Sequence, residues 1–403
     1  MKKTLLATAL LAGFSSAAVA NSSVTLYGIL DGGFAHHSTK ITQGGESLKT
    51  TSFGMRGFNG VRNGNRWGLR GSEDLGDGLK VIFQLESGFD LGNGRSLQGT
   101  TGGDTRLFGR QAWVGLTSEN WGTLTLGRQH TIAVDTVGTR GPFNVGYQQA
   151  GQLFGAFGAS VFARMDNAIK YWSPTFAGFK VGLGYSGESN KQTLSGVGTI
   201  SENSSNWITA GGSYNNGPIS VGVSYDRFDT DKKAWTGNYK GKVHMWNLFG
   251  SYDFDIVKLD LGYGQVRGAI GNPNSGTTEW QAGGIGLNSQ LAGRARNAAG
   301  LAYHQTNGYR QQAWTLGLTA PVGDAGKVLF SYQGSATKNT GDAFHGAKGK
   351  VSIFSLGYEH SLSKRTLVYA LATIGRGDLK WNDGTPKAKL RTSIVGVGMQ
   401  HRF

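Results

Sequence analysis

Apolar and polar residues alternate with a period of two along most of this 403-residue chain. Clear examples are the runs LKVIFQLE at 79–86, ISVGVSYD at 219–226 and VGVGMQHRF at 395–403. Successive side chains of a β-strand point to opposite faces of a sheet, so each run predicts a strand with two chemically different faces. No comparable helical pattern competes with these runs, and the chain is therefore expected to be all-β.

Short turn signals divide these strands into hairpins. Seven such turns are expected, at residues 76–78, 118–120, 173–175, 215–218, 253–255, 321–324 and 361–363. Longer polar stretches separate the hairpins, at residues 39–65, 189–205, 230–241, 268–310 and 375–390. Seven tight turns fit a sixteen-stranded antiparallel barrel with both chain ends on one rim. Short periplasmic turns opposite long extracellular loops are typical of transmembrane barrels of the bacterial outer membrane.

A soluble β-sandwich or propeller is the alternative to a membrane barrel. The expected strands are about 9 to 13 residues long, the length that a tilted strand needs to cross a bilayer. A propeller is not expected to alternate short turns with long loops so uniformly. The chain also ends on an amphipathic strand that closes with Phe403. These three features favour the membrane barrel.

The first 20 residues have the features of a secretory signal peptide. Lys2 and Lys3 supply a positive start, residues 5–14 form an apolar run, and Ala18–Val19–Ala20 is a small-x-small cleavage site. We expect the mature chain to begin at Asn21 and residues 21–403 to form a single barrel domain, because no linker interrupts them. Beyond residue 20 the sequence has no apolar run of about 18 residues, so no transmembrane helix is expected.

Composition excludes several classes of site. The chain has no Cys, which rules out disulfides, thiolate metal sites and cysteine nucleophiles. Its formal net charge is +15, from 40 basic and 25 acidic residues, and this charge is dispersed. Export and dispersed charge together disfavour nucleic acid as a partner. The adjacent His36 and His37 would point to opposite faces of a strand, so no metal site is expected, and no cofactor is predicted.

Five segments resemble the general porins of Gram-negative bacteria, especially those of β-proteobacteria. They are SVTLYG at 23–28, RWGLRGSEDLG at 66–76, RQAWVGL at 110–116, GRQ at 127–129 and GMQHRF at 398–403. The resemblance extends over essentially the whole mature chain. It implies a homotrimer of sixteen-stranded barrels, each with a water-filled pore narrowed by a third long loop that folds inward. It also implies that Phe403 is a signal read by the outer-membrane assembly machinery.

Basic residues are expected on the wall of this pore. Trp67 and Leu69 point outward, so Arg66 and Arg70 would face the lumen. On the next strand the alternation turns Lys80 and Glu86 inward. By similarity to porin constrictions, the basic ladder on the wall would consist of Arg66, Arg110 and Arg164.

The inward loop, at about 130–163, is poor in carboxylates. It contains one acid, Asp135, beside Arg140, and it lacks the Pro-Glu-Phe-Gly-Gly segment of enterobacterial porins. An excess of arginine predicts a positive potential at the constriction and therefore a preference for anions. The alternative is that the arginines pair with Glu86, Asp135 and other loop carboxylates and leave the pore nearly neutral.

The chain is thus predicted to be a passive channel for small hydrophilic solutes and anions, and not an enzyme. A substrate-specific channel is the main alternative, in which Phe143 and Tyr147 of the inward loop would contribute to a binding surface. A hydrolase would need a nucleophile, a base and an orienting group together, and no His falls in such a context. An adhesive barrel with active loops is a further alternative. Outer-membrane lipid and lipopolysaccharide are expected partners.

Overall fold

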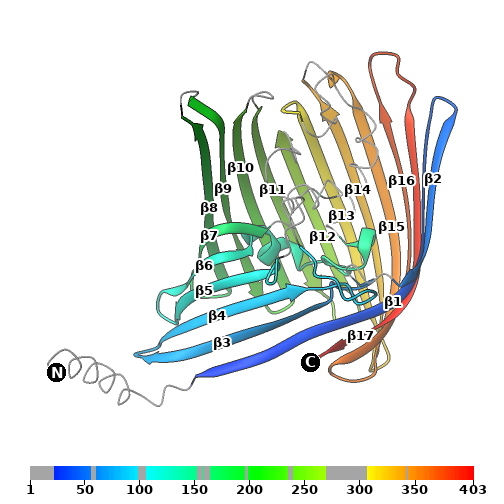
Figure 1. Ribbon diagram of the computed structural model, residues 1–403. Helices are drawn as coiled ribbons and strands as arrows, with labels where there is room; N and C mark the ends of the chain where they lie inside the picture. Colours follow the sequence, from blue (N-terminus) through cyan, green and yellow to red (C-terminus); the bar gives the residue numbers. More distant parts are fainter. Residues whose placement is uncertain are drawn as a thin grey trace.

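The computed structural model describes residues 22–55, 60–98, 106–151, 157, 164–195, 198–234, 239–268, 306–341 and 344–403. The expected signal peptide, residues 1–20, lies outside these ranges. Within them the chain forms one antiparallel sheet of seventeen strands, together with two short helical turns (Figure 1). None of the helices in the described ranges is long and apolar enough to cross a membrane.

The elements follow one another along the chain in a simple order. They are β1 Ser23–Gln43, β2 Glu46–Met55, β3 Arg66–Gly76, β4 Leu79–Gly88, β5 Gln111–Ser118, β6 Gly122–His130, η1 Val134–Gly138, η2 Gln148–Ala150, β7 Arg164–Trp172, β8 Phe179–Leu194, β9 Gly198–Asn216, β10 Ile219–Ala234, β11 Tyr239–Asp253, β12 Lys258–Gly268, β13 Tyr309–Val322, β14 Gly326–Asn339, β15 Lys348–Ser361, β16 Thr366–Lys380 and β17 Ala388–Arg402.

Sixteen of these strands form a closed wall. Each strand from β3 to β17 pairs with the next, β1 pairs with β3 through Ser23–Ile29, and β1 also pairs with β17 from Ile29↔Arg402 to Thr42↔Lys389. The last pairing closes the ring, which leaves the wall without the unpaired edges that an open sheet would expose to lipid.

The seven expected short turns are all present. They connect β3 to β4, β5 to β6, β7 to β8, β9 to β10, β11 to β12, β13 to β14 and β15 to β16. All seven therefore lie on one rim. The prediction from turn chemistry is confirmed. On the other rim three of the expected loops, 189–205, 230–241 and 375–390, are mostly strand, and only residues 195–197, 235–238 and 381–387 connect the paired strands there.

The first long stretch, residues 39–65, was wrongly expected to be a loop throughout. Strand β1 continues to Gln43, and β2 pairs with its upper half from Phe34↔Met55 to Gln43↔Glu46. Gly44 and Gly45 make the connecting turn with φ of +58° and +86°, the positive values that a two-residue hairpin turn requires. The segment escaped detection because β2 is exposed on both faces, so its sequence does not alternate.

The faces of the wall are inverted relative to a soluble protein. On β8 the outward Val181 and Leu183 are 57% and 56% exposed, and on β10 Val223 is 48% exposed. The inward Ser224 and Asp226 on β10 are at most 1% exposed. Apolar side chains outside and polar side chains inside are what a wall between lipid and water requires.

One side of the wall is lower than the rest. Strands β3–β7 contain 8 to 11 residues, whereas β8–β11 contain 15 to 19. The loop-side ends of β3–β7 therefore lie partway up the barrel and not at its upper rim (Figure 1). Side chains at these ends are held inside the channel.

Candidate functional site

The connection between β6 and β7 folds into the barrel, as expected for the third long loop. Its described part, residues 131–151 and 157, includes η1 and η2. Ile132, Val137, Phe143 and Phe157 in it are at most 1% exposed, because they pack against the inner wall. Figure 1 shows the two helical turns within the ring of strands.

Glycines on the inner wall make room for this loop. A Cβ atom at Gly222 of β10 would overlap Thr136 of the loop, and one at Gly317 of β13 would overlap Pro142. Gly182 of β8, Gly211 of β9 and Gly357 of β15 similarly face the loop residues Ile132 and Phe143. We call these five positions the glycine track. Their missing side chains let the loop backbone lie directly against the strands.

A buried carboxylate fixes the segment that follows β2. Asp31 of β1 is 0% exposed and lies where β1 meets the end of the chain. Its oxygens accept hydrogen bonds from the backbone N–H groups of Val61 (3.0 Å), Arg62 (3.3 Å) and Asn63 (3.1 Å), from Tyr369 Oη (2.6 Å) and from Gln400 Nε2 (3.1 Å). Residues 60–65 are thereby held against β16 and β17.

Arg62 connects this fixed segment to the inward loop and to β15. Its Nε donates to Glu359 Oε1 of β15 at 2.7 Å and to Tyr147 Oη of the loop at 3.0 Å. Tyr147 itself donates to Glu359. Burial lowers the pKa of Arg62, but its hydrogen bond to Glu359 and neighbouring charges outweigh that effect and raise the pKa overall. Burial also raises the pKa of Tyr147, so its hydroxyl remains a donor.

Further hydrogen bonds attach the loop along its length. Arg140 donates to Val221 O of β10 at 2.9 Å, and Gln333 of β14 donates to Ala150 O at 2.6 Å. Asp135, the loop acid singled out in the sequence, pairs with Lys170 Nζ of β7 at 2.9 Å. The loop is therefore fixed to the wall on several sides of the channel.

Phe143 and Tyr147 do not form a lumenal surface. They are 1% and 3% exposed, and their rings meet edge to face at 5.3 Å in contact with the wall. The ring of Tyr147 also contacts Tyr369 of β16 at 5.5 Å. The two aromatic residues that could have supported a substrate-specific channel are used to hold the loop.

The structure brings the three arginines of the expected ladder together. Arg66 begins β3, Arg164 begins β7, and Arg110 directly precedes β5. Arg66 interacts electrostatically with both other arginines and with Glu86. Arg110 Nε lies 2.6 Å from Glu86 Oε1, and both side chains are less than a tenth exposed. One arginine of the ladder is thus neutralised by the predicted wall carboxylate.

Sequence reasoning missed three other cations of this region. Arg106 and Arg128 both pair with Asp166 of β7, at 3.0 and 2.5 Å, and Lys170 pairs with the loop acid. The inward alternation of β6 and β7 and the Gly-Arg-Gln motif at 127–129 could have identified two of them. The described cluster on β3–β7 and the loop segments beside them contains six cations, Arg66, Arg106, Arg110, Arg128, Arg164 and Lys170, and three carboxylates, Glu86, Asp135 and Asp166.

Lys80 lies apart from this cluster, whereas Arg70 borders it through Tyr27, whose hydroxyl donates to Glu86 at 3.0 Å. Arg70 is exposed and its guanidinium lies 5.3 Å from the centre of the Tyr27 ring. Lys80 is exposed beside the 76–78 turn, opposite Asp74. A strand rises about 3.3 Å per residue, so Lys80 lies roughly 20 Å along β4 from Glu86. Lys80 therefore belongs to the short-turn end of the channel, whereas Arg70, opposite Gln84, lies midway along β3.

The C-terminal residue is part of the closure between β1 and β17. Phe403 N donates to Gly28 O at 3.2 Å, and Gly28 N donates to Phe403 O at 3.0 Å. A Cβ atom at Gly28 would overlap the Phe403 ring, so that glycine provides the space in which the ring lies.

The chain belongs to the Gram-negative porin family, since the model of that family matches residues 7–378. It is therefore an outer-membrane channel and not an enzyme, and the predicted family, location and sixteen-stranded barrel are confirmed.

Two curated relatives and one solved structure illustrate the similarity. The chain is 40% identical over 419 residues to an outer membrane porin protein of Bordetella pertussis, with 100% of each chain covered. It is 31% identical over 423 residues to outer membrane porin protein 32 of Delftia acidovorans, again with 100% of each covered. The anion-selective porin from Comamonas acidovorans has the same fold, with a TM-score of 0.60 at 23% identity over 95% of this chain and 100% of that one.

Proposed function

We propose that this porin passes small hydrophilic solutes by passive diffusion and prefers anions to cations. The observation that carries the proposal is the twofold excess of cations over carboxylates in the described cluster on β3–β7, six against three. Such an excess in a narrow aqueous passage raises the local concentration of anions. The fold is also similar to that of a porin described as anion-selective, which supports the proposed preference for anions.

The arginines of the ladder differ in how far neighbouring carboxylates compensate their charge. Arg110 is matched by Glu86 at 2.6 Å, whereas Arg66 Nε donates to a backbone oxygen, Gly64 O, at 3.0 Å. The charge of Arg66 is therefore less compensated than that of Arg110. We place Arg66 first among the selectivity residues, with Arg164, Arg110, Glu86, Asp135, Arg140 and Arg70 as supporting groups and Lys80 as a charge of the short-turn vestibule.

The test is the reversal potential of the purified channel in a planar bilayer under a KCl gradient. The wild-type channel is expected to favour chloride, and Arg66→Gln with Arg164→Gln is expected to reduce that preference. The control is Arg365→Gln, which removes an exposed charge in the turn between β15 and β16. A potassium preference in the wild type, or an unchanged preference in the double variant, contradicts the proposal.

We further propose that the barrel functions as a homotrimer. Porins are typically trimeric, and the trimer form of OmpT, an outer membrane protein of Vibrio cholerae, has the same fold with a TM-score of 0.54 at 13% identity over 95% of this chain and 99% of that one. Outer-membrane lipid, lipopolysaccharide and the assembly machinery are the other proposed partners. The mass of the detergent-solubilised protein tests the trimer directly.

A further inference from the structure

A row of cationic side chains crosses the outside of the barrel near its loop rim. The strand register places Arg267 opposite Arg310, Arg310 opposite Lys338, Lys338 opposite Lys348 and Lys348 opposite Lys380. These five residues lie on the consecutive strands β12–β16, and we call them the cationic row. Each step from strand to strand joins two like charges.

The cationic row points away from the channel. Arg310 alternates with Tyr309 and Gln311, which face inward and are 0% and 2% exposed. Arg310 has the same parity as the outward Trp314, and Lys338 alternates with the buried Thr337 and Asn339. The row therefore has no part in lining the pore.

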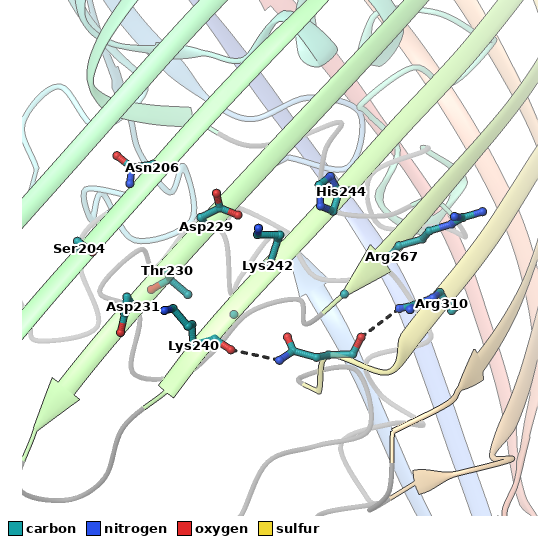
Figure 2. Close-up of a pocket in the computed structure, with 13 residues that line it drawn as sticks. Ser204, Asn206, Asp229, Thr230, Asp231, Lys240, Lys242, His244, Arg267 and Arg310 are labelled. Carbon is teal, nitrogen blue, oxygen red and sulfur yellow. Dashed lines mark hydrogen bonds and ion pairs between the residues drawn. The ribbon is translucent and has the colours of Figure 1, made fainter.

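Two adjoining hollows follow the row. The first, of about 840 Å³, extends over β9–β13 and contains Arg267 and Arg310 together with Asp229 and Asp231 (Figure 2). The second, of about 450 Å³, is lined by Arg267, Arg310, Lys338, Lys348 and Lys350. No carboxylate occurs among the described residues that line the second hollow, so it favours an anion.

The acids of the first hollow are already engaged. Asp229 lies 2.6 Å from Arg227, and Asp231 lies 3.2 Å from Lys240. Among the described residues, the cationic row itself forms no ion pair with a carboxylate. Like charges directly opposite each other destabilise a pair of strands. Anions from outside the chain would remove that repulsion.

The position of the cationic row relative to the outward aromatic side chains indicates which anions could reach it. Outward aromatic side chains lie below it, including Trp314 four residues from Arg310 and the ring pair Tyr332–Phe354 at 4.8 Å. Aromatic girdles mark the level of the membrane interface. A strand rise of about 3.3 Å per residue puts Arg310 roughly 13 Å along β13 from Trp314, toward the loop rim. The row thus lies at the headgroups of the outer leaflet.

We propose that the cationic row and its second hollow bind the phosphate groups of lipopolysaccharide in the outer leaflet. The two arginine forks can hold phosphate oxygens through paired hydrogen bonds, and the lysines supply point charges beside them. The acyl chains would then lie along the aromatic and apolar outer wall. This proposal depends on the outer-membrane lipid partner proposed above and is independent of ion selectivity.

The experiment measures binding of lipid A to the purified barrel in detergent by native mass spectrometry. Bisphosphorylated lipid A is compared with dephosphorylated lipid A, and inorganic phosphate alone serves as the third probe. The test variant is Lys338→Gln with Lys348→Gln. The control is Lys364→Gln with Arg365→Gln, which removes the same charge from the exposed turn between β15 and β16.

The test variant is expected to bind bisphosphorylated lipid A about thirtyfold more weakly than the wild type, because each lysine near an anionic surface contributes on the order of a factor of five. The control should bind as the wild type does. Lys338→Arg with Lys348→Arg should restore binding, which separates loss of charge from loss of folding.

Three outcomes overturn the proposal. They are equal binding by the test variant, equal binding of dephosphorylated lipid A, and full displacement of lipid A by millimolar inorganic phosphate. Conductance and reversal potential of the same preparations are recorded in parallel, and the test variant should match the wild type in both. A failure of lipid binding and a failure of anion preference are then separate results.

Discussion

At the scale of single residues, the notable feature is a chain of buried polar contacts that is not part of the arginine ladder. Asp31 binds the backbone at 61–63, Arg62 extends to Glu359, and Tyr147 joins both to the inward loop. These residues come from four distant parts of the sequence. No local motif marks them, because their roles exist only after the barrel has closed.

Removing one partner of the buried Arg62–Glu359 ion pair should destabilise the barrel. Arg62→Met leaves Glu359, which is 2% exposed, with Lys327 as its other cation, and is expected to lower the free energy of unfolding by about 3 kcal/mol. The loss should be visible as a lower urea midpoint and as increased open-channel noise.

Lys327→Met is the matched control for that substitution. Lys327 contacts the same carboxylate at 2.8 Å, but its side chain is 44% exposed and its charge is better solvated. Its loss should cost below about 1 kcal/mol. Equal effects of the two substitutions would show that Arg62 has no special role in holding the loop.

At the scale of elements, the alternating pattern and turn chemistry predicted the wall well. All seven short turns follow from the sequence, but β8–β11 and β13–β17 contain 14 to 19 residues and extend beyond the expected length of about 9 to 13 into stretches expected to be loops. Strand β2 was missed because both of its faces are exposed, and the periodicity argument needs one buried face. The sequence also could not show that β3–β7 end partway up the channel, since their ends depend on where the inward loop and residues 60–65 lie. The arginine ladder was found by resemblance, but its pairing with carboxylates required coordinates.

The glycine track makes a testable claim about the inward loop. Gly222→Val would place atoms where Thr136 of the loop now lies, so the loop must move into the lumen. We expect a smaller single-channel conductance and a stability loss of about 1 to 3 kcal/mol. Conductance in a planar bilayer and urea unfolding measure the two effects.

The neighbouring strand offers a control for this steric effect. Gly250 of β11 has open space where a Cβ would lie, so Gly250→Val should leave the conductance unchanged. If Gly222→Val also conducts as the wild type does, then the loop does not depend on the glycine track for its position.

At the scale of the whole molecule, closure brings together segments from opposite ends of the chain. Ile29 lies opposite Arg402, and Phe403 exchanges two backbone hydrogen bonds with Gly28. Every wall strand therefore has two partners, and the channel cannot form before the last strand is in place. Folding of the purified chain uses the backbone pairing of Phe403, whereas assembly in the cell is proposed to use its side chain as well.

The assembly role proposed for Phe403 follows from this position. Phe403→Ala retains the backbone pairing with Gly28 and is expected to refold in detergent with a yield close to that of the wild type. Its amount in the outer membrane of producing cells should fall severalfold, as measured by immunoblotting of membrane fractions. Met399→Ala, which truncates an exposed apolar side chain of the same strand, is the control. Equal amounts of Phe403→Ala and wild type in the membrane would refute the role.

The pairing of β1 with β17 also means that the ring of strands has no intrinsic starting point. A linker joining the two ends of the wall, with a new opening made in one of the long connections, would give a circularly permuted chain. Such a chain would contain the same sixteen neighbour relations in a different order of synthesis. The geometry of the pore thus depends on which strands are neighbours in the ring. The order in which the strands assemble depends on where the chain ends lie in that ring.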